Sequence, residues 1–386
     1  MSENEPATSA PPSYRPGLEG IVAGLSAISE VDPIRDHLTY RGYDAVELAR
    51  NATFEETAYL LLYGDLPGSD DLEKFSRRLK AGRSLPPDLV SLLKRLPRRS
   101  HPVDLLRTAV SYLGLKAKAT GGGSHEENMD KAVRLIAQVP GLVATGTRLT
   151  RGLKPVSSDP DLPHAANFLY MMTGRRPEEF CARVFDATMI LYADHGFNAS
   201  TFSARVTAST LSDMHSAITS AIGTLKGDLH GGANEKAVRM LLEVRSPARA
   251  EAWVMDALGR KKKIMGFGHR VYKKGDSRAP LLKELCTELA RRLGKTKWGE
   301  VARIIEEVMM REKKLFPNVD FPAGLVYYLL EIPIDFYTAI FAAARMAGWT
   351  AHVIEQLDNN KLIRPECHYT GPRNLPYVPV QERNHS

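Results

Sequence analysis

Three histidines and one aspartate occupy places in the sequence where acid–base chemistry could occur. His195 and His230 each precede a glycine, His269 follows one among basic residues, and Asp320 lies in a proline-rich segment. Glycine-containing loops are where binding and catalytic residues concentrate. One carboxylate and several imidazoles can move protons both ways on one substrate, the carboxylate as base and an imidazole as acid. The pattern favours a proton-transfer enzyme.

Each of these residues also has an ordinary structural explanation. His195 could cap a helix C-terminus, where the helix dipole favours positive charge. His230 could be a turn residue, and His269 could belong to a basic loop. Asp320 could be the N-cap of a helix that Pro322 opens. The occurrence of all four in one chain is what favours a functional site.

The neighbours of the histidines suggest the kind of ligand. Small residues beside His230 and His269 would let a bulky ligand approach the backbone closely. Arg278 follows His269 by nine positions. Arginine holds a carboxylate through two parallel hydrogen bonds, which lysine does less well. A substrate that carries carboxylates fits these residues.

Two other classes of function are open on the residues alone. His195, His230 and His269 could bind a metal ion with Asp320 as a fourth ligand. Metal-binding histidines usually include a close pair such as HxxxH, and none of these three lies within 30 residues of another. A nucleic-acid-binding protein would need a basic patch interleaved with aromatic residues, which is absent. Neither a metal nor a nucleic-acid partner is expected.

The net charge of +7 is concentrated in one part of the 386 residues. Residues 230–333 contain 21 Lys and Arg against 13 Asp and Glu, so the rest of the chain is close to neutral. This segment should attract anions, although a solvated basic face is the alternative.

Nothing in the sequence indicates a membrane or secretory protein. The first 16 residues are polar and lack an apolar core, so we expect a disordered tail rather than a signal peptide. The longest apolar stretch, 323–349, is interrupted by Glu331, Pro333 and Asp335, which predicts a buried helix, a turn and a second buried helix. The three cysteines, at 181, 286 and 367, form no CxxC pair and are expected to be free thiols in the cytoplasm.

Helical signals dominate, so the sequence predicts an all-α fold. Thr53 and Glu56 form a capping-box pattern before a helix that Gly64 ends. Two helices joined at 174–177 are expected between residues 160 and 195, and another should end at Gly294. Strand patterns occur near 20–31 and 38–42, where a small sheet could form.

Several motifs, in order and over more than 300 residues, give the chain a specific resemblance to the citrate synthase family. They are DPDLPHAANFLYMMTG, NASTFSARV, HGGANE, IMGFGHRVYK, NVDFPAG and ARMAGWTAHVIEQ. The resemblance implies a mainly helical homodimer with the active site in a cleft between two domains. The large domain would comprise 17–227 and 333–386 after the tail at 1–16, and the small, coenzyme A-binding domain 228–332. The acidic nucleotide of coenzyme A would account for the basic segment.

The resemblance also implies roles for single residues. Asp320 would remove a proton from the methyl group of the acyl thioester, His230 would donate a hydrogen bond to the thioester carbonyl, and His269 would polarise or protonate the ketone. The oxaloacetate carboxylates would be held by His195, Arg278 and Arg345, and by Arg364 of the partner subunit. Coenzyme A would contact Ile264, Gly266, Phe267, Gly268 and Asn318.

The reaction implied is that of citrate synthase in the tricarboxylic acid cycle, an acyl transfer in which acetyl-CoA, oxaloacetate and water give citrate and CoA without a permanently bound cofactor. The alternative is a 2-methylcitrate synthase that uses propionyl-CoA, since one methylene is worth only about 1–3 kcal/mol in an apolar pocket. Two positions depart from the family pattern. Glu366 stands where many relatives are basic, and Tyr192 where many citrate synthases have His and some 2-methylcitrate synthases have Tyr.

Overall fold

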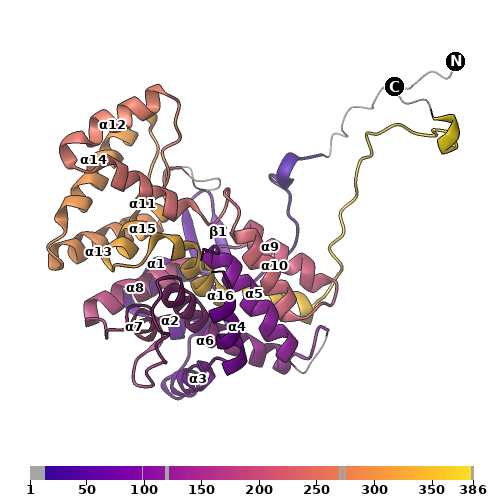
Figure 1. Ribbon diagram of the computed structural model, residues 1–386, viewed down its shortest axis with the longest axis horizontal. Coiled ribbons are helices and arrows are strands. Elements are labelled where there is room, and N and C mark those ends of the chain that lie inside the picture. The colour runs from indigo at the N-terminus through magenta and orange to yellow at the C-terminus, as the bar shows by residue number, and fades with distance from the viewer. Residues whose placement is uncertain (1–13, 98, 118–120, 269–271, 273–274, 384–386) are drawn as a thin grey trace. The chain divides into compact units, whose positions relative to one another are not determined.

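The computed structural model describes residues 14–97, 99–117, 121–268, 272 and 275–383. Within these ranges the protein contains sixteen α-helices and a single three-stranded sheet, so the all-α prediction is confirmed (Figure 1). The helices are α1 (Ala45–Asn51), α2 (Phe54–Tyr63), α3 (Ser69–Gly82), α4 (Pro87–Arg95), α5 (Pro102–Lys116), α6 (His125–Thr150), α7 (His164–Thr173), α8 (Glu179–Tyr192), α9 (Ala199–Ser209), α10 (Met214–Leu225), α11 (Ala233–Val244), α12 (Pro247–Gly259), α13 (Arg278–Arg292), α14 (Thr296–Lys313), α15 (Asp320–Leu329) and α16 (Tyr337–Asp358).

The helix boundaries predicted for α2, between α7 and α8, and within 323–349 are confirmed. Thr53 and Glu56 satisfy each other's backbone N–H groups at the start of α2, and Gly64 ends that helix in the left-handed conformation. The helices α7 and α8 are joined at 174–178. The apolar stretch 323–349 divides into α15, a 3₁₀ turn (Ile334–Phe336) and α16. In the described part of the chain, no helix is both long and apolar enough to cross a membrane.

The predicted N-terminal sheet is present but short. Strands β1 (Ser29–Asp32), β2 (His37–Tyr40) and β3 (Tyr43–Asp44) pair antiparallel in chain order. Ser29 lies opposite Tyr40 in the β1–β2 register. Residues 21–28, which the pattern included in the first strand, are not part of the sheet.

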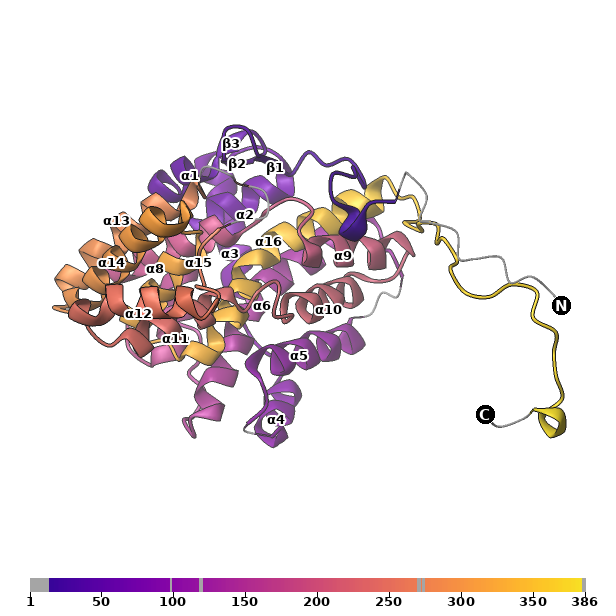
Figure 2. The same cartoon turned by 90° about the horizontal axis from the view of Figure 1, so that it is seen from above.

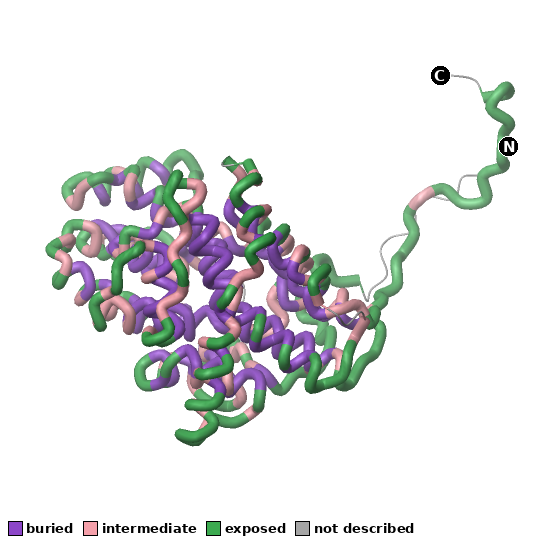
Figure 3. The backbone as a smooth tube through the Cα atoms, turned by 60° about the horizontal axis from the view of Figure 1, so that its bottom comes forward, coloured by how far each residue is buried: buried purple, intermediate pink, exposed green. Residues whose placement is uncertain are grey.

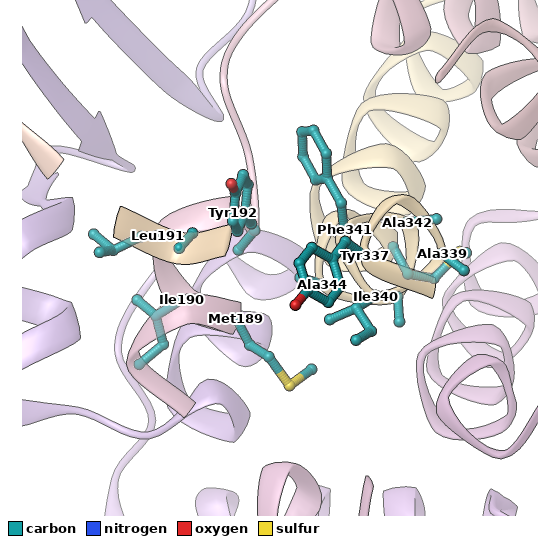
Figure 4. Packing of buried hydrophobic residues seen from close by; sticks show 14 of the residues in the cluster. Met189, Ile190, Leu191, Tyr192, Tyr337, Ala339, Ile340, Phe341, Ala342 and Ala344 are labelled. Atoms are coloured by element: carbon teal, nitrogen blue, oxygen red, sulfur yellow. The ribbon is translucent and has the colours of Figure 1, made fainter. Parts of the chain in front are cut away.

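The core is centred on α16, whose described side chains are nearly all buried. A helix that is apolar around its whole circumference must be enclosed by other elements, and α16 packs against α2, α5, α6, α8, α9 and α10. Figure 3 shows the buried residues gathered in the interior, with exposed residues around them. Figure 4 shows the contact of α16 with the end of α8, where Tyr192 faces Phe341. Two helices that reach the core from distant parts of the sequence are thereby fixed against each other.

Residues 26–362 form one compact unit, and the terminal segments 1–25 and 363–386 form another. The described terminal residues contain two 3₁₀ turns, Pro16–Leu18 and Val380–Glu382, and are mostly exposed. Within the compact unit, α11 to α15 pack on one another and lie together in both views (Figures 1 and 2). This group falls inside the predicted small domain, but the boundaries at 228 and 332 stay a prediction.

Candidate active site

The aspartate predicted as a base lies at the start of α15. Val319 has helical backbone angles and caps the helix, so Asp320 is its first residue and the N-cap explanation is wrong. The preceding chain is held by Asn318, whose N–H donates to the Gly266 carbonyl and whose side-chain amide donates to the Gly268 carbonyl, both at 2.9 Å. This pairing fixes where the helix begins.

Asp320 is half-buried and binds one buried tyrosine. The Tyr192 hydroxyl donates to Oδ1 of Asp320 at 2.6 Å. Burial raises the pKa of Asp320, while the Tyr192 hydrogen bond and the Arg278 and Arg345 guanidinium groups oppose the rise. Burial and the Asp320 carboxylate also raise the pKa of Tyr192 well above its usual value, so the tyrosine remains a donor. The site thus contains a carboxylate of increased basicity.

His230 lies in the turn before α11, as predicted. Its Nε2 is 2.8 Å from the Ser200 hydroxyl and 3.3 Å from the Ser200 backbone nitrogen. Because an N–H group can only donate, Nε2 is the acceptor and the neutral ring carries its proton on Nδ1. Burial lowers the pKa of His230 to about 4, and the Arg345 charge contributes. His230 therefore presents a neutral N–H donor.

The two glycines after His230 differ in what surrounds them. A Cβ on Gly231 would come within 2.5 Å of the Leu225 carbonyl oxygen and 2.9 Å of the Thr338 methyl group. This glycine is needed because the chain packs on itself there. A Cβ on Gly232 would meet nothing within 4 Å. Access for a ligand therefore explains Gly232 better than Gly231.

Arg345 is a buried cation with an unused donor. Its Nε donates to the Tyr192 carbonyl oxygen at 2.6 Å, and its guanidinium carbon lies 4.8 Å from the Phe341 ring centre. Its Nη1 is buried without a hydrogen-bond partner among the described residues. Burial lowers the pKa of Arg345, and the nearby Arg278 charge contributes, although Asp194 opposes the effect. An unsatisfied buried guanidinium is well suited to bind an anion.

Arg278 begins α13 and is also buried, but it has a carboxylate partner. Its Nε and Nη2 each donate to an Asp276 oxygen at 2.8 Å, and Nη1 donates to the Leu191 carbonyl at 3.3 Å. Burial alone would lower the pKa of Arg278, but Asp276 reverses the direction and raises it. Asp276 therefore holds two of the guanidinium nitrogens in place, and the third, Nη1, donates to a backbone oxygen.

His195 lies three residues beyond α8, next to Gly196, as the sequence predicted. Its Nε2 is 3.1 Å from the Tyr272 hydroxyl. The loop is anchored by Asp194, which is buried and accepts hydrogen bonds from the Gly196 N–H, the Ser29 hydroxyl and His352. Burial would raise the pKa of Asp194, but His352 and the hydrogen bonds hold it at about 2. A charged carboxylate therefore supports the loop.

The residues predicted to contact coenzyme A lie next to the Asp320 segment. Phe267 pairs with Pro317 in an isolated β-bridge, and the Phe267 ring lies 4.9 Å from the Phe321 ring. Ile264 and Phe267 are buried. The carbonyls of Gly266 and Gly268 already accept hydrogen bonds from Asn318. Part of the predicted backbone contact surface therefore serves the fold itself.

Two predicted residues cannot be placed relative to this site. His269 lies outside the described residues. Arg364 belongs to the terminal unit, where it is exposed. Of the remaining residues, Asp320 and Arg345 are connected through Tyr192, which contacts both of them and the Phe341 ring. The Phe341 ring in turn lies 6.3 Å from the His230 ring.

Sequence reasoning missed several residues that support the site. Asp276 could have been found from its spacing, since an aspartate two residues before an arginine can pair with it. Phe341 could have been found because it lies one helical turn before Arg345 on an apolar helix. The contact of Ser200 with His230 joins positions 30 residues apart and has no local signal.

Metal binding, cavities and thiols give three further facts about the described residues. These residues contain no cluster of three or more His, Cys, Asp or Glu side chains arranged to hold a metal ion. A cavity of about 540 Å³ is lined mostly by apolar residues of α4, α5 and α6 and of the segments that follow α4 and α6, together with Lys94 and Lys154, and its lining includes none of the described site residues. All three cysteines are free, as predicted.

Known proteins resemble the chain over almost its whole length. The family described as citrate synthase, C-terminal domain, matches residues 17–366. Citrate synthase 2 of Bacillus subtilis is 48% identical, covering 95% of this chain and 98% of the relative. 2-Methylcitrate synthase 2 of Corynebacterium glutamicum is 44% identical, covering 96% and 98%. The structure of Thermoplasma acidophilum citrate synthase in a ternary complex with carboxymethyl coenzyme A and oxaloacetate is 34% identical with a TM-score of 0.89, covering 95% of this chain and 99% of that chain.

The fold and these relatives define the class as mainly helical two-domain acyltransferases. Within that class, the chain belongs to the citrate synthase family.

Proposed function

We propose that the protein condenses acetyl-CoA with oxaloacetate and water to give citrate and CoA. The observation that carries this proposal is the position of Tyr192, whose hydroxyl binds Asp320 and whose backbone carbonyl binds Arg345. It joins a carboxylate of raised pKa to a buried cation with one donor that has no partner among the described residues. A base for the acyl group and an anchor for a carboxylate-bearing acceptor are thus held by one residue.

The first step would be enolisation of the thioester. Asp320 takes a proton from the carbon next to the thioester carbonyl, and the electron pair of that C–H bond moves toward the carbonyl oxygen. The Nδ1–H of His230 donates a hydrogen bond to this oxygen as its negative charge grows. A preorganised donor in a water-poor site stabilises such a charge more than water does. A neutral ring is a suitable donor at neutral pH because the pKa of His230 is lowered to about 4.

The second step would join the new nucleophile to the ketone carbon of oxaloacetate. Arg345 and Arg278, with His195, would hold the carboxylates so that the ketone faces the enol. His269 would polarise or protonate the ketone oxygen. Water would then cleave the thioester, releasing CoA as the thiol and citrate as the product. Coenzyme A would lie along 264–268 and Asn318, in the part of the sequence with the excess of positive charge.

The direct test is product analysis with the purified protein, oxaloacetate and either acetyl-CoA or propionyl-CoA. Citrate formation with a higher kcat/KM for acetyl-CoA would support the proposal, and a higher value for propionyl-CoA would favour 2-methylcitrate synthesis. Products should be separated by chromatography, because Cys367 is exposed and would react with a thiol reagent. No condensation with either thioester would overturn the proposal.

Replacement of Arg345 should separate binding of oxaloacetate from binding of the thioester. Arg345→Lys keeps a positive charge but loses the planar pair of donors. We expect the KM for oxaloacetate to rise about 10- to 100-fold, since a hydrogen bond to a charged group contributes about 1.5–3 kcal/mol. The KM for acetyl-CoA should stay nearly constant. Steady-state kinetics in both substrates checks this, and an unchanged KM for oxaloacetate would contradict it.

We also infer that the protein works as a cytoplasmic homodimer in which Arg364 completes the site of the partner. The support is the family resemblance and the exposure of Arg364. Arg364→Ala and Asp320→Asn should each be nearly inactive. Unfolded together in equal amounts and refolded, they should regain about a quarter of wild-type activity, because half of the dimers would have one intact site. No recovery, despite refolding of the wild type, would argue against a shared site.

A further inference from the structure

The two oxygens of the Asp320 carboxylate are in different surroundings. Oδ1 accepts the hydrogen bond from the Tyr192 hydroxyl at 2.6 Å. No donor among the described residues contacts Oδ2. A carboxylate can rotate about its bond to the chain unless one oxygen is fixed. The tyrosine contact therefore selects one orientation.

We propose that Tyr192 is a positioning residue whose hydroxyl fixes Oδ1 of Asp320, so that Oδ2 is the oxygen that removes the proton from the acyl thioester. This inference rests on the proposed function. It adds which oxygen of Asp320 takes the proton and which residue holds the other oxygen, neither of which the proposed function specifies. The C–H bond of the substrate breaks, the proton bonds to Oδ2, and the electron pair passes into the enolate. The O–H bond of Tyr192 stays intact.

Tyr192 is itself held on three sides, which positioning requires. Its ring packs on the Phe341 ring with centres 4.4 Å apart, and it is almost completely buried. Figure 4 shows the two rings facing each other between α8 and α16. Its carbonyl oxygen accepts the hydrogen bond from Arg345 Nε at 2.6 Å. Movement of the tyrosine would disturb the base and the cation together.

Other charged groups around Asp320 also affect its pKa, and they stay the same when the Tyr192 hydroxyl is removed. Arg278 on α13 and Arg345 on α16 lower the pKa of Asp320, whereas Asp276 raises it. These groups remain when only the hydroxyl is removed. The Tyr192 hydrogen bond stabilises the ionised carboxylate, so its loss makes the carboxyl group harder to ionise. The acid limb of the pH profile should therefore move to higher pH.

The test is Tyr192→Phe, which removes one oxygen atom and keeps the ring. We expect kcat to fall about 10-fold, and the acid limb of kcat/KM for the acyl thioester to move up by about 1 pH unit. The isotope effect on kcat with a deuterated methyl group should rise, because proton removal is the slowed step. The KM for oxaloacetate should change less than about twofold, since the backbone carbonyl that binds Arg345 is retained.

Tyr337→Phe is the matched control. Tyr337 is also buried, lies one helical turn from Phe341, and its hydroxyl has no hydrogen-bond partner among the described residues. Its pH profile and isotope effect should match those of the wild type. If the wild type is active, three results would overturn this inference alone. They are an unchanged pH profile in Tyr192→Phe, loss of oxaloacetate binding in Tyr192→Phe, and an equal shift of the acid limb in Tyr337→Phe. An inactive wild type would instead overturn the proposed function.

Discussion

Asp320→Asn should reduce kcat by about 10²- to 10⁴-fold, the range typical of a positioned general base. The amide has nearly the same shape as the carboxylate but cannot accept the substrate proton. The Tyr192 hydroxyl, which donates to Oδ1 at 2.6 Å, can still donate to the amide oxygen. The local structure should therefore survive while turnover is lost. Steady-state kinetics with acetyl-CoA and oxaloacetate measures the effect.

Binding of oxaloacetate distinguishes a catalytic role from a structural one. Calorimetric titration of Asp320→Asn with oxaloacetate should give an affinity close to that of the wild type, because Arg345 and Arg278 are unchanged. Glu306→Gln is a useful control, since Glu306 of α14 is also a partly buried carboxyl group of raised pKa but pairs with Lys283 of α13. Its kcat should be near that of the wild type. Loss of oxaloacetate binding in Asp320→Asn would identify Asp320 as structural.

His230→Ala should reduce kcat by about 10²- to 10³-fold, the effect of removing one donor to a developing oxyanion. The donor is the neutral Nδ1–H group, because Nε2 accepts the Ser200 N–H. The pKa of about 4 predicts that the ring is protonated only below that pH and stays neutral as the pH rises through 5 to 8. In the wild type, no limb of the kcat profile near pH 6.5, the ordinary histidine value, should therefore belong to His230.

A surface histidine provides the comparison for that variant. His125 begins α6, is exposed and lies 2.9 Å from Asp358. His125→Ala should leave kcat unchanged, and circular dichroism should show that both variants are folded. If folded His230→Ala retains more than about a tenth of wild-type kcat, the assigned stabilisation of the enolate is wrong.

Much of the fold follows from local signals in the sequence. The capping box at Thr53 and Glu56 and the left-handed Gly64 both act within one or two helical turns, and both were predictable. The start of α15 was not. The proline pattern predicted that the helix begins after Asp320. In the structure, Asn318 is held by hydrogen bonds to Gly266 and Gly268, and the helix begins at Asp320 itself. Contacts about 50 residues apart decided the boundary.

The candidate site, like the fold, has features that local sequence predicts and others that depend on distant contacts. Residue types and glycine neighbours indicated His195, His230 and Asp320, because ionisable groups in loops have a recognisable local context. The state of each group depends on distant residues. Ser200 sets which nitrogen of His230 carries the proton, and Tyr192 meets Asp320 across 128 positions of the chain. No single-sequence pattern contains that information.

Nη1 of Arg345 has no hydrogen-bond partner in the described part of the chain, and this has a consequence for the resistance of the protein to heat. A buried guanidinium without a full set of acceptors makes the empty protein less stable than it would be with that donor satisfied. Under the proposed function, oxaloacetate would supply the missing acceptor and so complete the core as well as the site. At a concentration 100 times its dissociation constant, such a ligand adds about 2.7 kcal/mol to the free energy of unfolding. The concentration of oxaloacetate would then influence how long the protein stays folded.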